Sequence, residues 1–182
     1  MQEVTKDIAL RFCNLCNWVY EVWVTHRHLF DKNQTPEEDI GKAKHFTSRL
    51  AIITQEYCIQ QIAKLHDPAV QGNSHNLSID FILQFGNWGE KAEEIKGMQT
   101  ELAELWEHLK PARNKALAHN DLDALMEDAP LGQFPEGADE AYFAVLQNLV
   151  NAVSEKWGEG SYAFNDLAGA DVEEFLAVLR KV

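Results

Sequence analysis

Residues 4–29 have the sequence VTKDIALRFCNLCNWVYEVWVTHRHL. This stretch decides the fold because its apolar residues recur every three or four positions. That spacing is the period of an α-helix, so we predict one long helix here. Two apolar stripes run along it side by side, which indicates contact with more than one neighbouring helix. The first stripe comprises Ile8, Phe12, Leu15, Val19, Val22 and Leu29, and the second comprises Ala9, Cys13, Cys16, Tyr20 and Trp23.

A second long helix is expected from about Pro36 to Leu65. Pro36 suits the first turn of a helix, and the acidic residues 37–39 favour the positive end of the helix dipole. Only a short polar connector separates this helix from the first one. Two long helices joined in this way are expected to form an antiparallel hairpin.

The remaining chain also alternates helical patterns with loop residues. Ser78 is expected to cap a short helix ending near Phe85, and Asp171 with Glu174 resembles a capping box at the start of a short final helix. No strand pattern is found. We therefore predict an all-α up-and-down bundle, with two long N-terminal helices, additional shorter helices and a single domain over residues 1–182. The other expected segments are loops at 67–76 and 128–139 and helices at 90–109, 143–157 and 171–179.

Composition limits the classes of function. Apolar residues make up 46% of the 182, which suits one globular core, and the net charge of −13 argues against general electrostatic binding of nucleic acid. The first fifteen residues lack the continuous apolar core of a secretory signal, and no run has the roughly 18 apolar residues of a membrane span. Three cysteines fit a reducing compartment. We expect a cytoplasmic protein with no membrane association.

One segment concentrates reactive side chains. Residues 110–123 have the sequence KPARNKALAHNDLD, and no acidic residue lies between Glu107 and Asp121. Arg113 and His119 are six positions apart, which places them about 120° around a helix and about 9 Å along it. Two copies of the segment across a two-fold axis would bring both pairs into one cleft.

The chemistry of this segment suits phosphate transfer without a metal ion or cofactor. The guanidinium of Arg113 can hold a phosphate, and His119 can exchange protons near neutral pH. Asn114 offers a donor and an acceptor to a phosphate or a ribose. These are the requirements of RNA cleavage by the neighbouring 2′-hydroxyl.

The segment from Arg113 to His119 resembles the signature of HEPN domains, which is an Arg, a polar residue, a short spacer and a His. The following residues 120–123 resemble the AbiU-type branch, which is linked to abortive infection. In that branch an early helix ends near an Asp-Pro and an Asn-Leu-Ser opens the next one, as Asp67-Pro68 and residues 76–78 do here. The resemblance implies a homodimeric, metal-independent endoribonuclease that leaves a 2′,3′-cyclic phosphate. It also implies a toxin restrained by an antitoxin protein or triggered by phage infection.

Three further residues are expected to contact RNA phosphates near Arg113, namely Lys110, Lys115 and His108. Pro111 cannot donate to a helix hydrogen bond, so the chain is expected to kink or restart there, with Arg113 and Asn114 near a new helix N-terminus.

Other readings of the same residues stay open. An Arg and a His at this spacing also occur in structural ion-pair networks, and the acidic composition favours a catalytically silent HEPN-type scaffold. A metal enzyme built from scattered histidines is a third class. It is disfavoured because these histidines show no paired spacing within a helix, and because Cys13 and Cys16 lack a second cysteine pair and are expected to be buried. The scattered histidines are His45, His66, His75 and His108.

Overall fold

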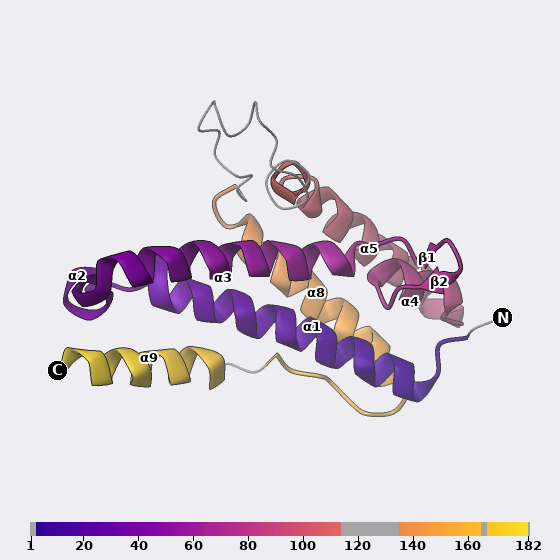
Figure 1. The fold of residues 1–182 in the computed structure, drawn as a ribbon. Coiled ribbons are helices and arrows are strands. Elements are labelled where there is room, and N and C mark those ends of the chain that lie inside the picture. Colours follow the sequence, from indigo (N-terminus) through magenta and orange to yellow (C-terminus); the bar gives the residue numbers. More distant parts are fainter. Residues whose placement is uncertain (1–2, 114–134, 165–166, 182) are drawn as a thin grey trace. The chain divides into compact units, whose positions relative to one another are not determined.

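The computed structural model describes residues 3–113, 135–164 and 167–181, and it is all-α apart from one minute β-hairpin (Figure 1). The predicted fold class is therefore confirmed. The first helix, α1, spans Lys6–His26 and continues as a π-helical turn over Arg27–Asp31. The second long helical region consists of α2 (Pro36–Asp39), a 3₁₀ turn (Ile40–Ala43) and α3 (Lys44–Leu65).

The described chain divides into two compact units. The first unit comprises residues 1–16 and 59–163, and the second comprises residues 17–58 and 164–182. The boundaries fall inside α1, after Cys16, and inside α3, after Cys58. The single domain expected from composition stays a prediction.

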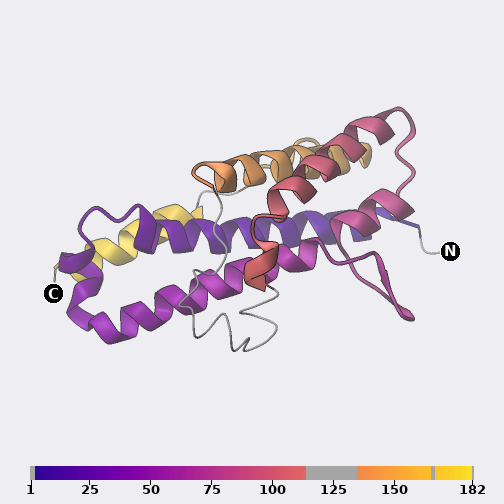
Figure 2. The same cartoon turned by 90° about the horizontal axis from the view of Figure 1, so that it is seen from above.

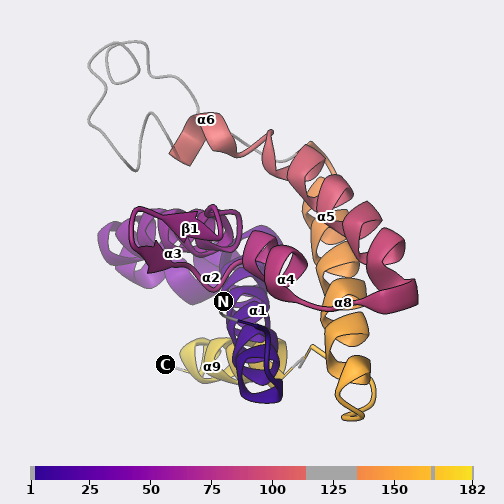
Figure 3. The same cartoon turned by 90° about the vertical axis from the view of Figure 1, so that its right-hand side faces the viewer.

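In the first unit, α5 (Ala92–Trp106) lies beside α8 (Ala138–Lys156), as both rotated views show (Figures 2 and 3). The apolar stripe of α8 is buried, with Leu146, Leu149 and Val150 at most 1% exposed. Cys13 is fully buried against α8, where its thiol donates to the carbonyl oxygen of Val150. Cys13 belongs to one of the two apolar stripes predicted for the first helix.

The connection into α4 (Ile79–Phe85) is capped as expected, because the hydroxyl oxygen of Ser78 accepts a hydrogen bond from the backbone N–H of Phe81 at 3.2 Å. The preceding loop contains a feature that the sequence pattern did not indicate. Strands β1 (Val70–Gln71) and β2 (Ser74–His75) pair in antiparallel register. Gly72 permits the tight turn between them, since its φ of 61° is unfavourable for other residues.

In the second unit, α9 (Leu167–Arg180) packs against the end of the first helical region, where Leu29, Val172 and Leu176 form a buried cluster. The guanidinium of Arg180 donates two hydrogen bonds of 2.8 Å to the carboxylate of Asp39. Together these contacts hold the last described helix to the helical region after α1.

The predicted capping box at Asp171 and Glu174 is wrong. Helix α9 already begins at Leu167, so Asp171 lies within the helix. The turn upstream of Asp171 is already helical and packs closely: an added Cβ on Gly169 would lie 3.2 Å from the imidazole ring of His28. A glycine in this turn allows the helix to approach the histidine.

Cys13 and Cys16 are both completely buried, as expected for structural cysteines. Burial raises the pKa of the Cys13 thiol to about 11. In the described ranges, no helix is long and apolar enough to cross a lipid bilayer.

Candidate functional site

The helix that leads to the reactive segment stops and restarts just before Arg113. Helix α5 ends at Trp106, a turn follows, and the short α6 spans Lys110–Ala112 with Pro111 in its first turn. Of the two outcomes expected at Pro111, a kink or a restart, the structure shows a restart. A proline is tolerated there because the first turn of a helix needs no intrahelical N–H donor.

Two buried residues anchor this restart. Trp106 and Leu109 are 8% and 3% exposed, and the backbone N–H of Leu109 donates to the carbonyl oxygen of Trp106 at 2.9 Å. The backbone N–H of Arg113 then donates to the carbonyl oxygen of Leu109 at 3.1 Å. The backbone that carries Arg113 is thus fixed to the core of the first unit.

The charged side chains around the restart are at the surface. His108, Lys110 and Arg113 are all exposed. The ammonium of Lys110 contacts the carboxylate of Glu107 at 2.6 Å, so part of its charge is already balanced. An exposed pair of this kind contributes little to stability, and a phosphate can compete for the lysine.

The predicted site is only partly covered by the described residues. His108, Lys110 and Arg113 lie in one short stretch, whereas Asn114, Lys115 and His119 lie outside the described residues. The spacing of Arg113 and His119 therefore stays a prediction.

A half-buried histidine of the first unit, His66, packs against the end of α5, and the sequence did not indicate this contact. Nε2 of His66 lies 2.9 Å from the hydroxyl of Tyr142, and its ring stacks on Trp106 with centroids 5.2 Å apart. Burial lowers the pKa of His66 to about 4, against the smaller opposing effect of Glu107. His66 is thus a neutral packing partner at neutral pH. The sequence shows His66 only as one of several scattered histidines, and its contacts with Trp106 and Tyr142 become visible only in the structure.

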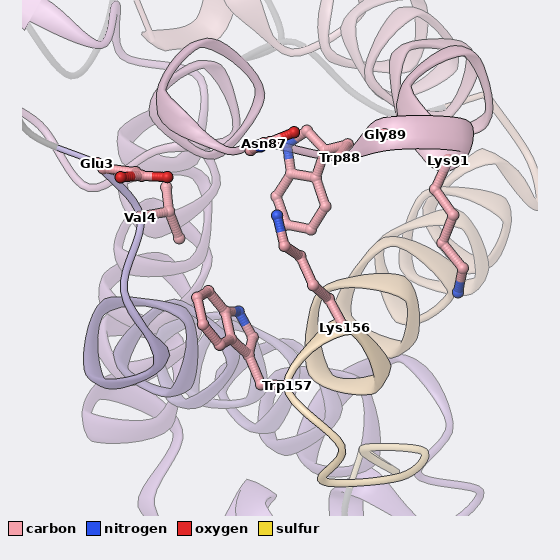
Figure 4. Close-up of a pocket in the computed structure, with 8 residues that line it drawn as sticks. All are labelled: Glu3, Val4, Asn87, Trp88, Gly89, Lys91, Lys156 and Trp157. Carbon is pink, nitrogen blue, oxygen red and sulfur yellow. The ribbon is translucent and has the colours of Figure 1, made fainter.

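A recess lies near the other end of α5, about 21 Å along the helix from Trp106. This pocket of about 390 Å³ is lined by the indoles of Trp88 and Trp157, and Figure 4 shows the Lys156 side chain extending toward Trp88. The Lys156 ammonium lies 4.5 Å from the centre of the Trp88 ring, as in a cation–π contact. Within the described chain, the indole N–H of Trp157 has no hydrogen-bond partner. The pocket is separate from the segment around Arg113.

The wall of this pocket depends on one glycine. The indole N–H of Trp88 donates to the carbonyl oxygen of Ile82 at 2.9 Å, across the position of Gly86. A Cβ on Gly86 would overlap the indole and would lie 2.6 Å from the Ile82 carbonyl oxygen. The sequence shows Gly86 two positions before Trp88, but it does not show that the indole packs against this glycine.

Within residues 3–113, 135–164 and 167–181, no three His, Cys, Asp or Glu side chains converge in a way that suits a metal ion.

Comparison with known proteins gives one result. The family model described as AbiU2, of the HEPN type, matches residues 2–177. No curated protein and no solved structure matches the chain.

Proposed function

Because the chain belongs to the AbiU2 family of HEPN domains, we propose that it is a metal-independent endoribonuclease of the toxin or phage-defence type. The observation that carries the proposal is the position of Arg113, which is exposed and directly follows a helix restart anchored by buried Trp106 and Leu109. A guanidinium on an anchored backbone suits the binding of a phosphate group in a defined orientation.

In the proposed reaction, the 2′-hydroxyl of a ribose attacks the adjacent phosphate. A bond forms from the 2′-oxygen to phosphorus, and the bond from phosphorus to the 5′-oxygen breaks. His119 exchanges protons with these oxygens, and Arg113 offsets the charge that develops on the phosphate. Asn114 orients the phosphate or the ribose. The products are a 2′,3′-cyclic phosphate and a 5′-hydroxyl.

The neighbouring residues Lys110, Lys115 and His108 contact adjacent phosphates in this proposal. Such contacts position the RNA but do not recognise its base sequence. A composite cleft between two copies brings two Arg113 and two His119 side chains together, which compensates for the angle of about 120° between the two residues on one helix.

The test is cleavage of mixed tRNA and mRNA by the purified protein in EDTA. The Arg113→Ala/His119→Ala double variant is compared with the wild type and with an Arg11→Ala/His45→Ala control. The control removes the same residue types from exposed positions in α1 and α3. We expect the wild type and the control to cut and to leave cyclic-phosphate ends. Equal cleavage by the Arg113/His119 variant would overturn the proposed site.

A second candidate function is a silent HEPN-type scaffold, which the net charge of −13 favours because it opposes RNA binding. In that case the protein would bind a partner, such as an antitoxin protein, but would never cut RNA. Purified protein freed from any partner distinguishes the two functions, because a restrained nuclease then becomes active and a scaffold does not.

A further inference from the structure

Exposed apolar side chains gather in the second unit. Among the described residues, every exposed large apolar side chain except Val70 belongs to this unit. Several of them follow the helical spacing of α3, so their pattern is that of a buried stripe, although this stripe is left uncovered. These side chains are Trp18, Phe46, Ile52, Ile53, Tyr57, Leu167, Phe175 and Val178.

Three of these side chains form the walls of a groove. Trp18, Tyr57 and Phe175 are 48%, 40% and 51% exposed, and they line a recess of about 480 Å³ over buried Leu29 and Val172. The walls come from α1, α3 and α9, all within the second unit. The indole N–H of Trp18 donates to the hydroxyl of Tyr57 at 3.3 Å, which links two of the walls. The groove is therefore a built feature with aromatic walls.

Among the residues that the structure describes, the charged residues that line this groove are acidic. Glu21 and Asp171 line it, and no described Lys, Arg or His does. His26 is nearby, since its Nδ1 lies 2.8 Å from the hydroxyl of Thr54, but burial lowers the pKa of this histidine and favours its neutral form. The groove thus combines an apolar surface with negative charge.

This combination determines which occupant fits. A second copy of the groove, placed face to face, would bring Glu21 and Asp171 against like charges, and an anionic lipid surface would be repelled in the same way. An amphipathic helix can insert apolar side chains at positions i, i+3, i+4 and i+7 into such a groove. Lysine or arginine residues beside those positions would then face the two carboxylates.

We propose that the groove bounded by Trp18, Tyr57 and Phe175 is a docking site for a basic amphipathic helix of a partner protein. The proposal does not depend on RNA cleavage. The apolar side chains of the partner supply the contact area, and its cations supply selectivity through Glu21 and Asp171.

Two labelled helical peptides test the charge selectivity. Both carry leucines at i, i+3, i+4 and i+7, and the remaining positions are Lys-rich in one peptide and Glu-rich in the other. Fluorescence anisotropy with the full chain is expected to show at least about tenfold tighter binding of the Lys-rich peptide. The Glu21→Gln/Asp171→Asn variant is expected to weaken that binding by roughly two- to tenfold. Equal binding of the two peptides would overturn the proposal.

A matched pair of variants tests the location. Phe175→Asp adds one negative charge inside the groove, and Val70→Asp adds the same charge at an exposed position in the first unit. We expect Phe175→Asp to weaken binding of the Lys-rich peptide more than tenfold and Val70→Asp to leave it nearly unchanged, with circular dichroism confirming that both variants are folded. Similar effects of the two variants would contradict the assigned groove. A wild-type dimer that Phe175→Asp converts to a monomer would show that the face binds a second copy instead.

Discussion

At the scale of single residues, the proposed chemistry depends on the guanidinium of Arg113. A lysine keeps the positive charge but lacks the planar fork that binds two phosphate oxygens at once. We predict that Arg113→Ala lowers kcat/KM for an RNA oligonucleotide by roughly 10²–10³-fold and that Arg113→Lys has an intermediate effect. The Arg11→Ala variant, which only breaks an exposed pair with Asp7, serves as the control. An Arg113→Lys variant with unchanged kinetics would show that charge alone suffices.

His66 gives a second residue-scale prediction, which concerns stability. Its pKa is about 4 in the folded protein and about 6.5 in the unfolded chain. Between these values the unfolded state binds the proton and the folded state does not, so the free energy of unfolding falls as the pH drops from about 6.5 to about 4. The full loss from this residue is about 3–4 kcal/mol, since the pKa difference is about 2.5 units and each unit corresponds to about 1.4 kcal/mol.

Urea unfolding of the wild type and of His66→Gln at pH 7 and pH 4.5 measures this contribution. The variant is expected to be less stable at pH 7, because it loses the stacking on Trp106, but to lose less stability on acidification. Parallel pH profiles for the two proteins would rule out His66 as the source. His26 contributes in the same direction in both proteins and therefore cancels in the comparison.

At the scale of elements, we expect the substitution of glycine by alanine to have opposite effects on stability at two positions. Gly86 ends α4 beneath the Trp88 indole, where no Cβ fits. Gly97 lies inside α5, and apart from the backbone of α5 itself no described atom lies within 4 Å of an added Cβ. We predict that Gly86→Ala destabilises the protein by about 1–3 kcal/mol through overpacking and that Gly97→Ala stabilises it by up to about 1 kcal/mol. Urea midpoints measure both changes. A loss of stability in both variants would contradict the packing described at Gly97.

The sequence predicted those elements whose signals are local. Helical periodicity located α1, α3 and α8, and the hydroxyl of Ser78 marked the start of α4 because an N-cap is a contact over three residues. The start of α9 was missed, and its first turn includes Gly169, which lies close to His28, a residue far away in the chain. For the candidate site, a kink or restart at Pro111 was predictable for the same local reason. The stacking of His66 on Trp106 was not, since it joins residues forty positions apart.

At the scale of the whole molecule, a net charge of −13 opposes the approach of RNA to a segment that is locally basic. Glu101 and Glu104 are exposed on α5, within two turns of its C-terminal end. We predict that Glu101→Gln/Glu104→Gln tightens RNA binding a few-fold in low salt and that the gain shrinks as salt is added. The same change at Glu38 and Glu56, in the second unit, is the control. Equal gains from both pairs would indicate a general charge effect.

The burial of Cys13 against Val150 also has a consequence for how the protein is made. The two residues are 137 positions apart, so α1 leaves the ribosome long before α8 exists. At synthesis rates of about 5–20 residues per second, roughly 7–27 s pass between the synthesis of Cys13 and that of Val150. The second unit is completed later still, because Leu29 packs against Val172 and Leu176 of α9. Throughout that interval the part of the apolar face of α1 that α8 later covers has no α8 to pack against.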